Sequence, residues 1–380
     1  MEEDIFEFST IFINEEPLKL TYLPTEIPFR PTQIKSIAKA MYKKNNMLGI
    51  GPTGTGKTLC CKYVHQELIK KDPTREVLYI PCGSLNTPKK ILDEITDLLN
   101  IKRQYRPSEY DLLKIFKKNK PEQYYLIMDE FDHMGVKQFS RMVKILEQIG
   151  LKALFITNKP IFPSTLDREI LNRLGWNIGR FERYNTDEIY HILTSRVNLA
   201  LKEGSINGES IVYLASIAAK HNDGDIRFAL QVLYMSANMA EDQKDKLITK
   251  RIIKKAIKEV QTSILIETLM SLDDSNKLII LTLGCTQNNS SSLYSIYKRL
   301  SKRFGVNTSD NYVTFWRRLN QLERDYSLLV THEIAASTGK RGGKTLNVVP
   351  LISQELFREI KTKLADSIGV SISYPQRTLV

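Results

Sequence analysis

Short apolar runs and amphipathic stretches alternate along residues 1–183 of this 380-residue chain. Three runs are apolar almost throughout, which is typical of parallel strands covered on both faces. These runs are EVLYIP (76–81), YYLIMD (124–129) and ALFITN (153–158), and a further strand is predicted from Asn46 to Ile50. An arm containing several prolines comes first, at residues 11–30, and helical spacing is found at residues 32–44, 56–71, 88–99, 110–118 and 138–149. The alternation predicts a doubly wound α/β domain, with helices on both faces of a parallel sheet.

From Thr186 onward the strand pattern stops, and apolar residues recur at spacings of three and four. The stretches with this spacing are residues 187–202, 210–220, 225–240 and 249–262. They predict a small helical domain.

The last part of the chain, from Ser275 to Val349, has a helical pattern at first and then two strand-like pieces. The pieces are SLLVTHEI (327–334) and KTLNVVPL (344–351), and AASTGKRGG between them supplies the glycines of a hairpin tip. Helices followed by such a hairpin are typical of a winged helix, in which we expect Ser290–Ser292 to form a loop. The predicted domains are residues 1–183, 184–265 and 266–380.

The composition is typical of a soluble globular protein. No run of eighteen apolar residues is present to span a bilayer, and the acidic stretch Met1–Phe8 does not resemble a secretory signal, so we expect no membrane association and a place in the cytosol or nucleus. Four cysteines without CxxC spacing indicate reduced core thiols, namely Cys60, Cys61, Cys82 and Cys285. The net charge of +12 indicates a polyanionic partner.

The segment GIGPTGTGKTLC (49–60) contains the most specific motif of the chain. Residues 51–58 fit GxxxxGK[ST], and the motif lies between a predicted strand and a predicted helix, which is the context that phosphate binding requires. A backbone without Cβ atoms can curl its N–H groups around phosphates, Lys57 would hold the β- and γ-phosphate oxygens, and Thr58 would place its hydroxyl on Mg²⁺. The alternative is a glycine turn without a ligand.

Polar side chains follow two of the predicted strands. Asp129 and Glu130 end YYLIMDE, where Asp129 would bind the Mg²⁺ shell and Glu130 would orient the water that attacks the γ-phosphate. Asn158 follows the next strand, at the same edge of the sheet, where its amide could reach the γ-phosphate or the water. The alternatives are a solvent-facing acidic pair and an asparagine that starts a turn.

Together these residues and motifs resemble the archaeal origin-recognition and cell-division-control initiator family of AAA+ ATPases. The resemblance spans about Leu20 to Leu351, and the matching pieces are YLPTEIPFRPTQI, GPTGTGKT, LIMDEFD, ITN, NRLG with RFERYNTDEI, DGDIRFALQVL and SNKLIILTL. It implies an AAA+ domain, a helical lid and a C-terminal winged helix, with ATP or ADP and Mg²⁺ as cofactors.

The resemblance also implies a role for each matching residue. The Walker A motif is Gly51, Pro52, Thr53, Gly54, Thr55, Gly56, Lys57 and Thr58. Asp129 and Glu130 correspond to Walker B, Asn158 to sensor 1 and Arg227 to sensor 2. The rest of the nucleotide-binding set is Leu59, Tyr190 and Arg30, the last on the adenine side of the pocket. Arg173 resembles the arginine finger that completes a neighbouring subunit's site, and because TLDREILNRLG lacks the Asp-Pro-Arg of many archaeal members, Arg168 is a rival.

Two basic regions are candidates for DNA contact. Residues 87–107 occupy the place of the family's DNA-touching insert and carry Lys89, Lys90 and Arg103. In the winged helix we predict a recognition helix at residues 309–325, which would enter the major groove, and a cationic wing tip in GKRGGK. The residues assigned there to DNA are Asn311, Thr314, Arg317, Arg318, Lys340, Arg341 and Lys344. The alternatives are a solvated basic helix and a winged helix used for protein contacts.

The function that follows is an ATP-dependent replication initiator that binds double-stranded origin DNA and helps to recruit or load the replicative helicase. Hydrolysis would be slow and act as a switch. A homologous AAA+ subunit is a further possible partner, and the expected location is the nucleoid of an archaeal cell, or the nucleus in a eukaryotic host. The alternatives are a clamp-loader-like ATPase with fast turnover and a regulatory AAA+ ATPase whose winged helix mediates protein contacts.

Overall fold

The computed structural model describes residues 11–102, 107–119, 123–283, 288–306, 311–326, 329–334, 345–351 and 353–368. The chain divides into two compact units, Met1–Ile257 and Lys258–Val380. Within the described part of the chain, no helix combines the length and the apolar character that crossing a bilayer requires.

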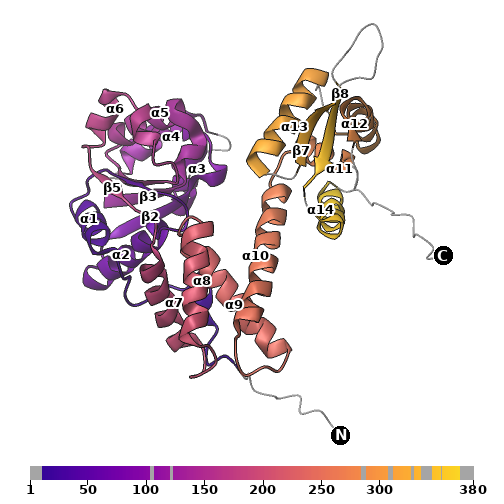
Figure 1. Ribbon diagram of the computed structural model, residues 1–380. Coiled ribbons are helices and arrows are strands. Elements are labelled where there is room, and N and C mark those ends of the chain that lie inside the picture. The colour runs from indigo at the N-terminus through magenta and orange to yellow at the C-terminus, as the bar shows by residue number, and fades with distance from the viewer. Residues whose placement is uncertain are drawn as a thin grey trace, which may run out of the picture. The chain divides into compact units, whose positions relative to one another are not determined.

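A five-stranded parallel sheet forms the centre of the first unit (Figure 1). Its strands are β1 (Met47–Ile50), β2 (Glu76–Pro81), β3 (Tyr124–Asp129), β4 (Lys152–Thr157) and β5 (Ile178–Arg180). The first four were predicted to within a residue, whereas β5 was missed because it has only three residues with a glycine in the middle. The strand order is β2-β3-β4-β1-β5, so that β1, β3 and β4 are neighbours.

Helices cover both faces of this sheet (Figure 1), as predicted for a doubly wound fold. On one face are α1 (Pro31–Tyr42) and α2 (Lys57–Lys71), with Met41 and Val64 in the core. The helices on the other face are α3 (Pro88–Leu98), α4 (Glu109–Lys118), α5 (Gly135–Gln148) and α6 (Arg168–Arg173). The short helix α6 was not predicted. The described residues also form short 3-10 helices, namely η1 (Glu16–Leu18) before α1, and η2 (Cys82–Ser84), η4 (Phe131–Met134) and η5 (Phe162–Thr165) between the later elements.

Buried thiols belong to the hydrophobic cores on both faces of the parallel sheet, as the sequence predicted. Cys60, Cys61 and Cys82 are buried and reduced, and burial raises the pKa of Cys60 and of Cys82 to about 12. These thiols are therefore unreactive near neutral pH. Cys285 lies outside the described residues.

The rest of the first unit is helical, as predicted, and includes the N-terminal arm. Its helices are α7 (Thr186–Ala200), α8 (Gly208–His221), α9 (Ile226–Asp242) and the start of α10 (Lys250–Met270). Residues 11–23, here called the strap, pack on these helices: Phe12 pairs with Leu201, and the N–H of Ile13 donates to the carbonyl oxygen of Ala200 at 2.8 Å. The strap is therefore part of the helical domain and not a separate arm.

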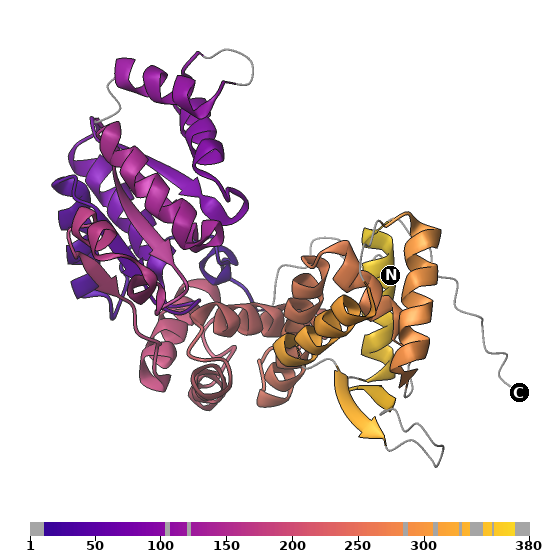
Figure 2. The ribbon, with the colours of Figure 1, turned by 90° about the horizontal axis from the view of Figure 1, so that it is seen from above.

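The helix α10 is longer than predicted and contains the expected domain boundary between residues 265 and 266. The second unit continues with α11 (Asp274–Thr282), β6 (Asn288–Asn289), α12 (Ser290–Phe304), α13 (Tyr312–Tyr326), β7 (Leu329–Ile334), β8 (Thr345–Pro350) and α14 (Gln354–Ser367). Figure 2 shows these helices, in orange to yellow, beside the short sheet. The strand order β6-β8-β7 is antiparallel, and the order of elements is that predicted for a winged helix.

Side chains from every layer of this unit form its core, including Leu278, Tyr297, Phe315 and Phe357. One expectation was wrong here. Ser290–Ser292 do not form a loop but begin α12, directly after the strand β6.

Candidate functional site

Three loops meet at one edge of the parallel sheet. Because β1, β3 and β4 are neighbours and run in the same direction, their carboxyl ends lie side by side. The glycine loop (residues 51–56) follows β1, Asp129 ends β3 and Glu130 follows it, and Asn158 follows β4. The sequence motifs are therefore brought together as predicted.

The glycine loop has no room for side chains at two of its positions. A Cβ atom on Gly51 would lie 2.3 Å from the carbonyl oxygen of Phe181. Gly54 has φ +70°, and a Cβ atom there would lie 1.8 Å from Oδ1 of Asp225 in the helical domain. The backbone N–H of Ile226 also donates to the carbonyl oxygen of Gly54 at 3.4 Å. The loop thus forms a bare backbone cradle against which the helical domain docks.

Lys57 lies inside the curl of this loop. Its side chain is buried, and Nζ donates to the carbonyl oxygens of Gly51 at 2.8 Å and Pro52 at 2.5 Å. Burial lowers the pKa of Lys57 to about 8, although the carboxylate of Asp129 favours the charged form. A phosphate group in the cradle would give this ammonium the anionic partner that it lacks.

Asp129 is held by two hydroxyl groups. Thr58 Oγ1 and Tyr79 OH each donate to Oδ2 of Asp129 at 2.7 Å. The sequence prediction included Thr58 but missed Tyr79, whose hydroxyl within an otherwise apolar strand was the only signal. Burial and the hydrogen bond to Asp129 raise the pKa of Tyr79, which stays protonated as a donor. Thr58 and Asp129 together offer the oxygen ligands that Mg²⁺ prefers.

Glu130 is positioned by its backbone and by Asn158. It has φ +54°, an uncommon conformation for a residue with a side chain, and its N–H donates to Oδ1 of Asp129 at 3.0 Å. The amide Nδ2 of Asn158 donates to Oε1 of Glu130 at 3.3 Å. Strained backbone of this kind is held in place by its surroundings and is frequent at functional sites.

Arg227 reaches the same place from the helical domain. It lies in the first turn of α9, where its guanidinium donates to Asp225 at 3.1 and 3.3 Å. About half of its side chain is exposed, so this pairing is weak and can be exchanged for another anion.

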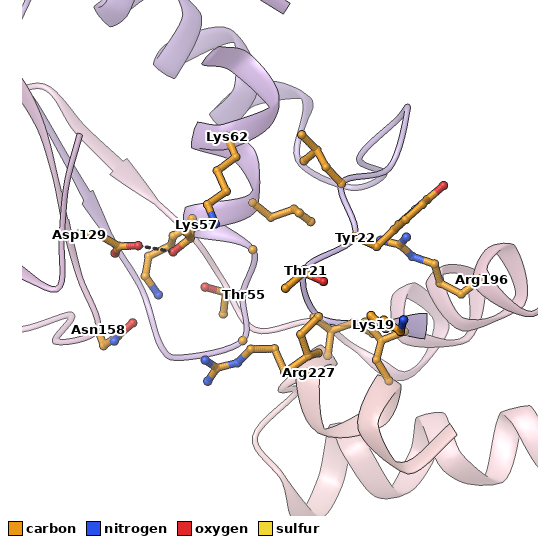
Figure 3. Close-up of a pocket in the computed structure, with 18 of the residues that line it drawn as sticks. Lys19, Thr21, Tyr22, Thr55, Lys57, Lys62, Asp129, Asn158, Arg196 and Arg227 are labelled. Atoms are coloured by element: carbon orange, nitrogen blue, oxygen red, sulfur yellow. Dashed lines mark hydrogen bonds between the residues drawn. The ribbon is translucent and has the colours of Figure 1, made fainter. Parts of the chain in front are cut away.

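A cavity of about 350 Å³ joins these groups (Figure 3). One end is lined by the glycine loop, Asp129, Glu130, Asn158 and Arg227. The other end is mainly apolar and is lined by residues 20–23 of the strap, Ile226 and Leu230, together with Arg196. The cavity therefore offers polar and cationic groups at one end and an apolar wall at the other.

Comparisons with known proteins agree with this geometry. Residues 40–162 match a family model described as an AAA domain, and residues 190–258 match the Cdc6 AAA+ ATPase-type lid domain. The ORC1-type DNA replication protein 1 of Archaeoglobus fulgidus is 27% identical over 366 residues, with 90% of this chain and 88% of the relative covered. The protein of the same name from Sulfolobus acidocaldarius is 27% identical over 382 residues, covering 94% and 95%.

Among solved structures, the Aeropyrum pernix ORC1 protein in complex with DNA is similar, with a TM-score of 0.77 and 21% identity, covering 94% of this chain and 98% of the other. Cdc6p from Pyrobaculum aerophilum has a TM-score of 0.61 and 22% identity, covering 94% and 99%. The chain is thus similar to archaeal origin-recognition and cell-division-control proteins, and it contains a match to an AAA domain followed by a match to a Cdc6-type lid. The helical domain contains the segment that matches the lid.

Two residues that the sequence resemblance assigned to nucleotide binding, Arg30 and Tyr190, do not line the cavity. Arg30 is buried behind the glycine loop, where it donates to the carbonyl oxygens of Thr55 at 3.1 Å and Glu182 at 2.7 Å and lies over the ring of Tyr184. It supports the loop from behind. Tyr190 contacts the ring of His191 and is likewise absent from the cavity wall formed by the described residues. Leu59 does line the cavity.

The candidate arginine finger, Arg173, does not line the cavity. Arg173, in α6, forms ion pairs with Glu169 and Glu147, and its carbonyl oxygen accepts from Asn46. Because Asn46 precedes β1, Arg173 is near the opposite edge of the sheet from the glycine loop. The rival Arg168 is exposed at the start of α6. A role toward a neighbouring subunit stays a prediction for both.

Some of the residues predicted to contact DNA lie within the described part of the chain, and others do not. Lys89 pairs with Asp93 at 2.8 Å, and Nζ of Lys90 donates to Asn86 at 3.2 Å. These contacts are exposed and weak, so both lysines remain accessible to phosphate. Arg103, Lys340, Arg341 and Lys344 lie outside the described residues.

The residues at α13 that were predicted to contact DNA have different surroundings in the structure. Oδ1 of Asn311 accepts from the N–H of Thr314 at 2.9 Å and so caps the helix. Arg318 is paired with Asp273 of the same unit at 3.0 Å, whereas Arg317 is exposed. Arg317 is therefore the strongest of these candidates for a contact with a separate molecule.

Proposed function

We propose that this chain is an ATP-dependent DNA replication initiator that binds origin DNA and helps to recruit or load the replicative helicase. The observation that carries the proposal is the convergence of Lys57, Asp129 and Glu130 on one cavity that the lid also lines. The ORC1-type DNA replication proteins of Archaeoglobus fulgidus and Sulfolobus acidocaldarius are similar to this chain over most of their length and support the same function.

The residues fit a bound Mg·ATP. The bare backbone of the glycine loop and the buried ammonium of Lys57 would hold the phosphates, and Thr58 and Asp129 would hold Mg²⁺. When bound, Mg²⁺ supplies positive charge that stabilises the transferring phosphoryl group. The carboxylate of Glu130 would orient water and accept its proton, and the amide of Asn158 would fix the direction of that carboxylate.

The exposed pairing of Arg227 with Asp225 supports a switch in the lid. In the structure Arg227 is paired with Asp225, and Asp225 also packs against Gly54 of the glycine loop. A γ-phosphate would compete with Asp225 for the guanidinium, which would alter how the lid docks. We propose that hydrolysis is slow and that its role is to reset this contact.

Basic side chains of the second unit support DNA binding. Arg317 on α13 is exposed, and so are Arg299, Lys302 and Arg303 on the preceding helix α12. Such side chains match the phosphates of a duplex, with α13 as the recognition helix in the major groove. The Aeropyrum pernix ORC1 structure, which is similar over most of its length, is a complex with DNA.

Partners and location follow from the same proposal. The replicative helicase and a homologous AAA+ subunit are the proteins that we expect to bind, and Arg168 or Arg173 of α6 would face the second. The expected location is the nucleoid of an archaeal cell, since the similar proteins named above are archaeal.

Selection of DNA from a random duplex pool tests the proposal. The chain is mixed with the pool in Mg·ATP, and the bound fragments are sequenced. We expect a recurrent sequence motif to be enriched by the wild-type chain and enriched less by Arg317→Ala. Enrichment of no motif by the wild-type chain, although it binds ATP, would favour a clamp-loader-like or regulatory ATPase instead.

The lowered pKa of Lys57 gives a pH dependence for nucleotide binding. Only the ammonium form attracts phosphate, and bound phosphate raises the pKa again, so affinity for Mg·ADP is full below pH 8 and lost as the pH rises above it. Between pH 7 and pH 9 we expect isothermal titration calorimetry to show a loss of about tenfold, since that is the loss of protonated lysine over this range.

Lys57→Arg is the matched control because a guanidinium stays charged throughout this range. Its affinity for Mg·ADP, whatever its absolute value, should be flat from pH 7 to pH 9. Parallel pH profiles in the two proteins would show that another group is responsible.

A further inference from the structure

A buried guanidinium with one unsatisfied nitrogen lies in the wall of the cavity. Arg196, on the lid helix α7, is only 7% exposed, and its Nη1 atom is buried without a hydrogen-bond partner among the described residues. Its guanidinium carbon lies 4.6 Å from the centre of the Tyr22 ring. Burial lowers the pKa of Arg196, which reflects the cost of keeping this charge away from water.

The place of Arg196 indicates which part of a ligand it faces. It lies at the apolar end of the cavity with Ile226 and Leu230, whereas Lys57 and Asp129 lie at the other end. Figure 3 shows its side chain extending from the lid toward Tyr22 of the strap, on the side of the cavity away from Asp129 and Asn158. It also lines an adjoining cavity of about 540 Å³, whose wall includes Tyr22, Leu59 and Tyr184. A nucleotide with its phosphates in the glycine loop would place its nucleoside toward this end.

An unpaired buried charge is costly and is retained where a ligand can satisfy it. The neighbouring side chains Ile226 and Leu230 have no acceptor to offer. The Tyr22 ring stabilises the cation through its face but gives the buried Nη1 atom no hydrogen-bond acceptor. The missing component is therefore a hydrogen-bond acceptor that arrives from the cavity.

We propose that Arg196 donates a hydrogen bond to the nucleoside part of the bound nucleotide, at a ring nitrogen of the base or an oxygen of the ribose. The inference rests on the proposed nucleotide site and adds a binding residue that the family motifs did not indicate. Because Arg196 belongs to the lid and Tyr22 to the strap, a nucleoside held by Arg196 joins lid, strap and glycine loop. Binding of the nucleoside thus relieves the unpaired charge and stabilises the closed arrangement of these three segments.

The variant Arg196→Met tests this directly because methionine is long and apolar and leaves no charge to bury. We expect isothermal titration calorimetry to show an affinity for Mg·ADP lowered by about tenfold or more, the loss typical of a hydrogen bond to a charged group. The melting temperature without nucleotide should stay the same or rise, since a cost has been removed. Arg251→Met is the control, because Arg251 is exposed on α10 and should change neither quantity.

A purely structural role for Arg196 predicts different changes in the melting temperature and in the affinity for Mg·ADP. If the residue only fixed the strap through Tyr22, Arg196→Met would melt at a lower temperature without nucleotide and bind Mg·ADP as the wild type does, and this result would overturn the proposal. Inorganic tripolyphosphate separates the two ends of the ligand, since it lacks a nucleoside. It should bind the wild type and Arg196→Met equally, and an equal loss for ADP and tripolyphosphate would place Arg196 on the phosphates and also overturn the proposal.

The same titrations distinguish this inference from the function on which it rests. A wild-type chain that binds no ADP would contradict the proposed nucleotide site. A wild-type chain that binds ADP, together with an Arg196→Met variant of equal affinity, would contradict the role of Arg196 alone.

Discussion

Replacement of Lys57 by alanine should lower the affinity for Mg·ATP by about 100-fold or more, which is about 2.8 kcal/mol. The ammonium is buried inside the glycine loop, where it already donates to the carbonyl oxygens of Gly51 and Pro52. Its removal deletes a charge-assisted contact to the phosphates and leaves these carbonyl groups without their donor. Titration calorimetry with Mg·ATP measures the loss.

Lys62→Ala is a matched control for this variant. Lys62 lines the same cavity from the same helix, but its side chain is exposed, so its removal should change the affinity by less than about threefold, in the range of exposed charges. Equal ATP binding by the wild type and Lys57→Ala would show that the phosphates are not bound in the glycine loop.

Replacement of Glu130 by glutamine should leave ATP binding within about threefold and lower the turnover by about 100-fold or more, as expected for the loss of a general base. Glutamine has the same shape, and its carbonyl oxygen can still accept from Nδ2 of Asn158, but it cannot take a proton from water. Release of labelled phosphate under single-turnover conditions measures the hydrolysis step.

The conservative change Glu259→Gln controls for the loss of one acidic charge, since Glu259 is exposed on α10. Its turnover should equal that of the wild type. Unchanged turnover in Glu130→Gln would assign the proton transfer to another group at this edge of the sheet.

The polar end of the cavity could be predicted because it depends on local sequence. The glycine loop, Asp129 and Asn158 each follow a strand that has a clear apolar pattern, and parallel strands bring their carboxyl ends together. Spacing and strand direction were therefore sufficient to place these groups.

The apolar end of the cavity could not be predicted because tertiary packing creates it. Arg196 appears in the sequence as one charge within an amphipathic helix, and only the packing of the strap against α7 shows that it is buried next to Tyr22. Tyr79 likewise depends on the pairing of β2 with β3, which the sequence does not specify.

Contacts within the chain explain why candidate residues for DNA binding were harder to predict from the sequence. Asn311 and Arg318 have the chemistry that reads bases or phosphates, but the same groups serve here as a helix cap and as a partner of Asp273. Arg317, next to Arg318 in the sequence, is exposed. A pattern that predicts the helix correctly does not reveal which of its polar residues are already used.

We propose that a nucleotide bound in the cavity controls how the chain binds DNA. The most direct test is the equilibrium affinity of Glu130→Gln for a duplex obtained from the selection, measured by fluorescence anisotropy in Mg·ATP and in Mg·ADP. We expect this variant to hold ATP without consuming it. We expect the two affinities to differ by about fivefold or more, the lower end of typical coupling between sites. Equal affinities in the two nucleotides would contradict the claim.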